Sequence, residues 1–207
     1  MGRQPLGSLR TQFFTTIPLV MAIVCDPAAA QSTAEDKPVT IYLVRHAEKQ
    51  EPASNPDSET PLNTEGQARA DTLARLLSNC QITVVYTTPY KRTIDTARPL
   101  VEEKTLSDSP VVVPPRELSA LPDRIRRSGA SAVLVVGHSN TVPANVRALA
   151  AREDAVPNIA DDAFHDLLVV TVTRWKPREA VVKHYRFGKL NASGSSSALP
   201  EFHGCGN

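Results

Sequence analysis

Residues 39–48 read VTIYLVRHAE, and this stretch decides the fold class. Its first six residues are β-branched, aliphatic or aromatic, and such a short apolar run predicts a buried strand over Val39–Val44. The apolar run then ends, and Arg45-His46-Ala47-Glu48 follow it directly. A polar loop over Lys49–Pro61 comes next, before a helix that opens at Asn63. The stretch therefore places polar and ionisable side chains directly after a buried strand.

Outward from this stretch, apolar runs of strand length alternate with segments of helical periodicity. The last two runs are joined by a turn around Pro177, which predicts a closing antiparallel hairpin. This alternation favours the α/β class, as a three-layer α/β/α sandwich with a mostly parallel central sheet. Further strands are expected over 82–86, 111–113, 132–136, 167–172 and 180–185, and helices from Asn63, from Pro89 to about Glu103, over 117–128, and over 143–151 with Thr141 as a cap.

Three of the expected strands end in residues that carry chemistry. Arg45-His46 follow the first strand, Arg92 lies near the start of the helix after the second, and Gly137-His138-Ser139-Asn140 follow the fourth. In open α/β sheets, ligands bind in the crevice outside the carboxyl ends of the strands. We therefore expect two histidines and two arginines to share one crevice.

Such a set suits a phosphoryl group. Arginine offers planar, bidentate donors to phosphate oxygens and keeps its charge at any working pH. The helix that starts after His138 adds backbone N–H groups that favour an anion. A neutral imidazole can act as the nucleophile, so that one histidine attacks phosphorus while the other donates to a phosphate oxygen.

Four segments resemble the histidine phosphatase superfamily, also called phosphoglycerate-mutase-like. Their order and spacing match the family over residues 39–150, and the strands to about residue 187 fit the same fold. The matching segments are Leu43–Lys49, Leu62–Ala70, Tyr86–Ala97 and Val135–Asn140.

The resemblance implies a role for each matching residue. His46 is expected to be the nucleophile that becomes phosphorylated, and Arg45, Arg92 and His138 are expected to complete a phosphate pocket. Asn140, at the end of the fourth segment, is expected to bind substrate with them. The family commonly has Gly where Ala47 stands, and Ala recurs there in small phosphatases of the group.

The proton donor to the leaving group is left open by the sequence. Members of the family often carry an acidic residue after the third strand, and Glu117 stands near that place. Glu48 is a second candidate, and some small members lack a donor at that place. Glu117 also suits a helix start, where a carboxylate interacts favourably with the helix dipole.

The function expected from these residues is that of a phosphomonoesterase acting through a phosphohistidine, with no cofactor. The five histidines are scattered and no zinc-binding motif is present, so metal catalysis is not expected. Gly137-His138-Ser139-Asn140-Thr141 also lacks the second glycine of a serine-hydrolase elbow. A phosphohistidine-protein phosphatase, a mutase and a catalytically silent phospho-ligand binding module are the alternatives, although the loop over 50–61 is short for a mutase.

The N-terminus has the pattern of a secretory signal peptide. Arg3 and Arg10 precede an apolar core over Phe13–Cys25, and three alanines end at Ala30, after which cleavage is expected. The core is short for a bilayer span, so a permanent anchor is disfavoured, and a lipid anchor on Cys25 is an alternative. The sequence therefore predicts an exported, periplasmic protein, with a domain over 31–190 and a mobile tail over 191–207.

Charge and cysteine content limit the partners of the mature chain. The 23 basic and 22 acidic residues of the whole chain become 21 of each without Arg3, Arg10 and Asp26, so no basic footprint for nucleic acid is present and a small phosphorylated substrate is the expected partner. Cys80 and Cys205 remain, and an oxidising compartment permits them to pair. A disulfide that tethers the tail and two free thiols are both consistent with the sequence.

Overall fold

The computed structural model describes residues 1–2, 37–173, 176–187, 202 and 205. Contacts divide the chain into two units, Met1–Gln31 and Ser32–Asn207, and the described helices and strands all belong to the second. The signal peptide expected over 1–30 lies outside the described residues except for Met1 and Gly2, as does the tail expected over 191–207 except for Phe202 and Cys205.

Six strands form one sheet in the order β3-β2-β4-β1-β5-β6. Parallel pairing joins β3, β2, β4 and β1, whereas β5 is antiparallel to both of its neighbours, β1 and β6. The expected sheet, mostly parallel with a closing hairpin, is confirmed. The strands are β1 (Val39–Arg45), β2 (Val84–Thr87), β3 (Val111–Val112), β4 (Ala132–Gly137), β5 (Asp166–Val172) and β6 (Val181–Arg186).

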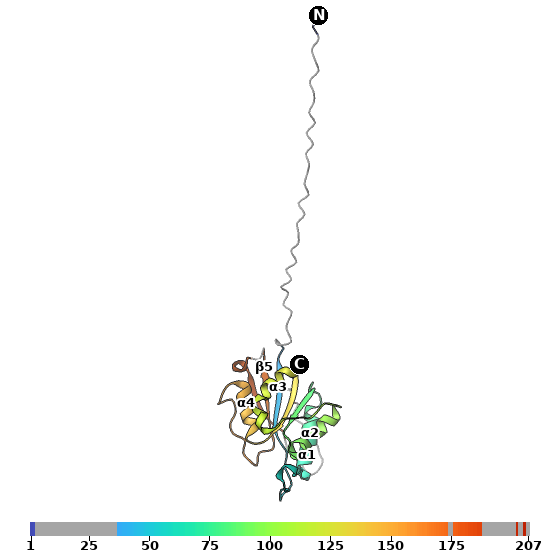
Figure 1. Cartoon of the computed structure of the whole chain (residues 1–207), viewed down its shortest axis with the longest axis vertical. Coiled ribbons are helices and arrows are strands. Elements are labelled where there is room, and N and C mark those ends of the chain that lie inside the picture. The colour runs from blue at the N-terminus through green and yellow to red at the C-terminus, as the bar shows by residue number, and fades with distance from the viewer. Residues whose placement is uncertain (3–36, 174–175, 188–201, 203–204, 206–207) are drawn as a thin grey trace. The chain divides into compact units, whose positions relative to one another are not determined.

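Helices cover both faces of this sheet (Figure 1). On one face, Ile41 and Leu43 of β1 belong to a core that α3 and α4 complete. On the other face, Tyr42 and Val44 belong to a core with α1 and α2. Because both faces of β1 are buried, its sequence is apolar without interruption rather than alternating. The helices are α1 (Thr64–Leu77), α2 (Lys91–Glu103), α3 (Leu121–Ser128) and α4 (Thr141–Ala150), with short 3-10 helices η2 (Asp57–Glu59), η3 (Pro115–Ala120) and η4 (Pro177–Glu179).

Two helices begin at different residues than the sequence pattern predicts. The helix expected over 117–128 is a 3-10 helix, η3, followed by α3, which carries Pro122 in its first turn. The last helix begins at Thr141 rather than at Pro143, and Pro143 lies in its first turn. Both shifts have the same reason: the first N–H groups of a helix have no intrahelical partner, so a proline fits there without losing a hydrogen bond.

The start of α1 is fixed against the segment that follows β1. Asn63 caps the helix, since its side chain accepts a hydrogen bond from the Gly66 amide at 2.8 Å. The Asn63 amide in turn donates to the carbonyl of Glu48 at 3.0 Å. A Cβ on residue 66 would collide with the backbone of Glu48, so only glycine permits this close approach. These contacts hold the backbone next to His46 in one position.

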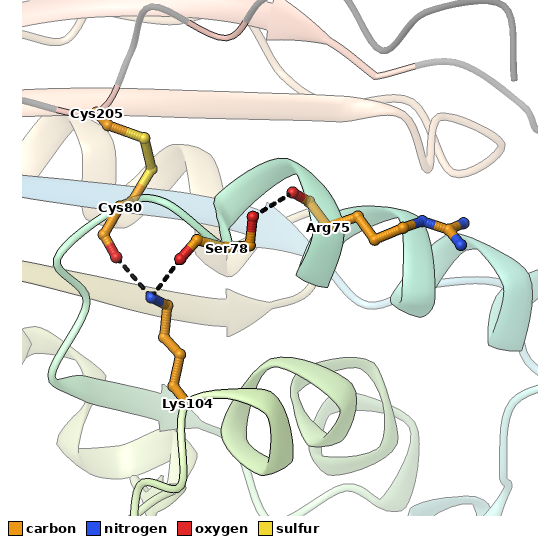
Figure 2. Close-up of a disulfide and its surroundings, with 5 residues drawn as sticks. All are labelled: Arg75, Ser78, Cys80, Lys104 and Cys205. Atoms are coloured by element: carbon orange, nitrogen blue, oxygen red, sulfur yellow. Dashed lines mark hydrogen bonds between the residues drawn. A yellow bond between two sulfur atoms is a disulfide. The ribbon is translucent and has the colours of Figure 1, made fainter.

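A disulfide joins Cys80, in the loop after α1, to Cys205 near the C-terminus (Figure 2). The pair closes a loop of 125 residues, with the two Cα atoms 4.8 Å apart. Phe202 packs beside it against Tyr42 and Tyr185, with ring centroids 6.1 and 5.0 Å apart. Of the two states that the sequence left open for these cysteines, the structure contains the disulfide.

We expect removal of this disulfide to destabilise the mature protein. Replacing both Cys80 and Cys205 by serine releases the loop in the unfolded chain, and the free energy of unfolding should fall by about 2–4 kcal/mol. Denaturant unfolding of the variant and of the wild type, each with and without reductant, measures the loss. Reductant should weaken only the wild type, and equal stability of the two proteins without reductant would contradict the prediction.

Candidate active site

The candidate site lies at the carboxyl ends of three adjacent strands, β2, β4 and β1. Arg45 is opposite Gly137 in the parallel ladder, and the His46 amide donates to the Gly137 carbonyl at 2.9 Å. The segments that leave β1 and β4 therefore start at the same level, which places His46 and His138 in contact. A cavity of about 510 Å³ opens there, and the residues that line it are Arg45, His46, Glu48, Lys49, Glu51, Asn63, Arg92, His138, Ser139, Asp161 and Phe164.

His46 is buried, with 4% of its surface exposed. Its Nδ1 lies 2.7 Å from the carbonyl oxygen of Ala47. A carbonyl only accepts hydrogen bonds, so Nδ1 carries the ring proton and Nε2 keeps its lone pair. Burial lowers the pKa of His46 to about 3, against the raising effect of the Ala47 hydrogen bond and with further lowering by His138, Arg45 and Arg92. The imidazole is therefore neutral at physiological pH.

His138 lies against His46, with ring centroids 5.3 Å apart in an edge-on arrangement. Its Nε2 is 3.0 Å from the Thr88 hydroxyl, which is 3.0 Å from the Thr93 hydroxyl. The Thr93 hydroxyl donates to a backbone carbonyl, that of Tyr90 at 2.7 Å or Thr88 at 2.9 Å. Since each hydroxyl has one proton, Thr88 donates to Thr93 and accepts from the Nε2–H of His138.

The electrostatic environment keeps His138 neutral in the empty site. Burial lowers the pKa of His138 to about 4, and the charges of Arg92 and Arg45 lower it further. A bound dianion would oppose those two charges, because an opposite charge close to an imidazole favours its protonated form. Phosphate binding is therefore expected to raise the pKa of His138.

Arg45 and Arg92 bring two guanidinium groups to the same cavity. Arg45 donates to the Ala160 carbonyl at 3.1 Å and stacks over the Phe164 ring at 4.2 Å. Arg92 stacks over Tyr90 at 4.4 Å. The Nε atoms of both arginines are buried and have no hydrogen-bond partner among the described residues. Buried donors are nearly always paired, so these two point to an anion as the missing partner.

Asp57 holds Arg92 from outside the sheet. The Arg92 Nη1 donates to the backbone carbonyl of Asp57 at 2.9 Å, and its Nη2 pairs with the Asp57 carboxylate at 3.0 Å. Lys49, which also lines the cavity, donates to the same carboxylate at 3.2 Å. The loop between β1 and α1 is thereby fastened to two cations of the site.

Glu48 lines the cavity, and its carboxylate pairs with Arg69. Arg69 donates to both of its carboxylate oxygens, with Nε to Oε2 at 2.8 Å and Nη2 to Oε1 at 2.5 Å. Such a bidentate pair stabilises the ionised carboxylate. Glu48 is thus present where the sequence placed it, as a carboxylate anchored to α1 rather than a protonated acid.

Four of the residues expected from the sequence come together, and two do not. Arg45, His46, Arg92 and His138 line one cavity. Glu117 is not among the lining residues, and its carboxylate forms an ion pair with Arg124. Asn140 is exposed and precedes α4 without a side-chain hydrogen bond to the helix. Its neighbour Thr141, expected as the cap, is the first residue of the helix, and its hydroxyl accepts from the His138 amide at 2.9 Å.

Sequence reasoning missed several residues that shape the site. Asp57, Tyr90 and Phe164 contact its cations or its imidazoles. Asp57 lies in a single 3-10 turn and Phe164 in an irregular segment, and both are too short for a periodicity that marks a residue as buried or functional. Tyr90 lies within the segment that resembles the family, and its position directly before a helix carrying Arg92 was a usable signal. Residues of the segments 49–61 and 161–166 line the cavity, whereas no residue of 114–123 does.

Among the described residues, no group of three or more His, Cys, Asp or Glu side chains is arranged to hold a metal ion. No helix within the described ranges is long and apolar enough to cross a bilayer.

Comparisons with known proteins agree with this architecture. The structure of a putative phosphohistidine phosphatase SixA from Agrobacterium tumefaciens is 20% identical, has a TM-score of 0.52, and shares 71% of this chain and 97% of its own. Phosphoglycerate mutase from Bacillus anthracis is 14% identical, with a TM-score of 0.54 over 74% of this chain and 94% of its own. The protein histidine phosphatase SixA complexed with tungstate is 22% identical, with a TM-score of 0.51 over 72% and 97%. At these identities the likeness shows a shared fold.

A search of curated proteins finds no match to this chain. The family model of the histidine phosphatase superfamily (branch 1) matches residues 41–116, which include His46 and Arg92. The family match over residues 41–116 and the shared fold agree with the motifs of the sequence, and this part of the chain is therefore similar to the histidine phosphatase superfamily.

Proposed function

We propose that this protein hydrolyses phosphate monoesters, without a metal ion, through a phosphohistidine intermediate on His46. The observation that carries the proposal is the pairing of a buried neutral imidazole with two arginines whose Nε donors lack partners in the same cavity. A neutral nucleophile beside unsatisfied cationic donors suits attack on a dianionic phosphoryl group.

In the first step the Nε2 lone pair of His46 forms a bond to phosphorus. The ester P–O bond breaks, and the leaving oxygen departs with the bonding electrons and takes up a proton. The guanidinium groups of Arg45 and Arg92 neutralise the equatorial oxygens, and the Nδ1–H bond to the Ala47 carbonyl stabilises the charge that develops on the ring. Holding these groups in place supplies most of what phosphoryl transfer requires.

In the second step water attacks the phosphohistidine. A new P–O bond forms, the P–N bond breaks, and the electron pair returns to Nε2 of His46. The water loses a proton to solvent or to a phosphate oxygen, and inorganic phosphate leaves. The bound dianion raises the lowered pKa of His138, and the protonated ring then donates to a phosphate oxygen in both steps.

A phosphohistidine-protein phosphatase is the second candidate, and the carboxylates of the cavity favour it. Glu48 pairs with Arg69, Glu51 lies 3.4 Å from Lys49, and Asp161 accepts from the Ser139 hydroxyl. In these contacts each carboxylate accepts from a cationic or hydroxyl donor, and none of the contacts offers a proton to a leaving group. Substrates whose leaving group needs little protonation by the enzyme are therefore favoured, and aryl phosphates and phosphohistidine, whose leaving group is an imidazole, belong to this class.

We also propose that the mature protein acts outside the cytoplasm, after removal of residues 1–30. The signal-peptide pattern of the N-terminus supports this, and so does the Cys80–Cys205 disulfide, because structural disulfides form and persist in oxidising compartments. A periplasmic location fits both observations.

The first test is to trap the phosphoenzyme of the mature protein. With an aryl phosphate and a chelator present, we expect turnover, together with an acid-labile phosphate adduct that maps to His46 by mass spectrometry under neutral conditions. His46→Ala should lower kcat by roughly a thousandfold or more, because the nucleophile is gone. His184→Ala, on the edge strand β6, is the matched control and should form the adduct normally. An adduct on another residue would contradict the mechanism.

A second test concerns the proton donor. Glu117→Gln should keep kcat/KM within about twofold of wild type on an aryl phosphate and on an alkyl phosphate alike, since Glu117 pairs with Arg124 away from the cavity lining. Loss of a general acid would instead slow the alkyl substrate by about a hundredfold or more. Such a selective loss would identify Glu117 as the donor.

A third test uses pH. The lowered pKa values of about 3 for His46 and about 4 for His138 predict that both rings are neutral at pH 5.5, where an ordinary histidine is mostly protonated. Ring NMR titration of the free protein measures this directly, and saturating phosphate should raise the pKa of His138. Because the unfolded histidines bind protons below about pH 6.5 and these rings do not, wild-type stability should fall as pH drops toward 4. A titration of either ring near pH 6.5 would contradict the prediction.

A further inference from the structure

The loop between β1 and α1 is closed at its base. An isolated bridge pairs Lys49 with Leu62, and the Gln50 amide donates to the Pro61 carbonyl at 3.0 Å. The 3-10 helix η2 lies near its far end and carries Asp57. Because the loop is fixed at its base, its far end can move as a unit when the contacts of Asp57 change.

The contacts of the tip are made to the cations that would bind phosphate. The Asp57 carboxylate pairs with Arg92 at 3.0 Å and with Lys49 at 3.2 Å. These partners differ in exposure, since the Arg92 side chain is 8% exposed and that of Asp57 is 49% exposed. Asp57 can therefore leave the pair by turning into solvent, whereas Arg92 cannot.

We propose that the Asp57 carboxylate is an internal competitor for phosphate at Arg92. This inference rests on the proposed function of the site. In the empty enzyme the Asp57 carboxylate pairs with Arg92. An incoming phosphoryl group replaces the carboxylate as the partner of Arg92. After hydrolysis the carboxylate pairs with Arg92 again and helps to displace the phosphate product. By linkage, phosphate bound at Arg92 weakens the hold of the Asp57 carboxylate on Arg92 by the same free energy.

The geometry separates this role from simple positioning of Arg92. Its Nη1 bonds to the backbone carbonyl of Asp57, and the same carbonyl accepts from the Thr60 amide at 3.1 Å, which closes the turn of η2. The Tyr90 ring supports the guanidinium from one face. Arg92 therefore stays in place when the carboxylate loses its charge, and only the competition is removed.

The test is the affinity of the mature protein for inorganic phosphate, measured by calorimetry at fixed ionic strength and pH 7. Asp57→Asn keeps the shape and the backbone contacts but loses the charge. We expect it to bind phosphate about fivefold more tightly than wild type, as removal of a competing half-exposed ion pair implies. Product inhibition by phosphate during turnover should strengthen to the same extent.

Glu59→Gln is the matched control. Glu59 lies exposed in the same turn, η2, and loses the same charge without touching Arg92, so its phosphate affinity should stay within about twofold of wild type. Equal or weaker phosphate binding by Asp57→Asn would overturn the competitor role and make Asp57 a positioning residue. An equal gain in both variants would also overturn it, as a general charge effect. The proposed function would instead be overturned if none of the three proteins bound phosphate and no phosphate adduct formed on His46.

Discussion

Arg45 lies opposite Gly137 in the parallel ladder of β1 and β4, so the chain leaves both strands at the same level. That register brings His46 and His138 into ring contact at 5.3 Å without any direct bond between them. A shift of one residue would exchange the faces of β1, so that Ile41 and Leu43 would point into the core that now holds Tyr42 and Val44, and the packing of both cores would be lost. The pairing that builds the hydrophobic core therefore also sets the geometry of the site.

The same burial that shapes the site creates an electrostatic cost, and the loops offset it. Two guanidinium groups and two imidazoles share one cavity, so the imidazoles stay neutral and the cations need partners. Arg45 takes the Ala160 carbonyl and the Phe164 ring, and Arg92 takes Asp57 and the Tyr90 ring. These partners satisfy the charges only in part. The two Nε donors have no hydrogen-bond partner in the described part of the chain, and the cavity therefore suits a tetrahedral anion.

Support for the site extends to the far end of α2. Lys104, which follows this helix, donates to the carbonyls of Ser78 and Cys80 at 2.8 and 2.7 Å, and Cys80 is bonded to Cys205 (Figure 2). The helix that carries Arg92 near its start is thus fastened at its end to the segment after α1 and, through the disulfide, to the C-terminal residues. A site built on a helix held at both ends needs little rearrangement to bind its ligand.

The sequence by itself predicted the fold class, the resemblance to the family, and four residues that line one cavity, because each signal is local; these are Arg45, His46, Arg92 and His138. An apolar run marks a strand, and residues directly after parallel strands share one edge of the sheet. Only the tertiary structure decided which carboxylates reach the site. Glu117 pairs with Arg124, Glu48 is fixed by Arg69, and Asp57 holds Arg92 across 35 residues of sequence. Such partnerships depend on how loops fold back over the sheet, and loops carry no periodicity from which a distant partner can be read.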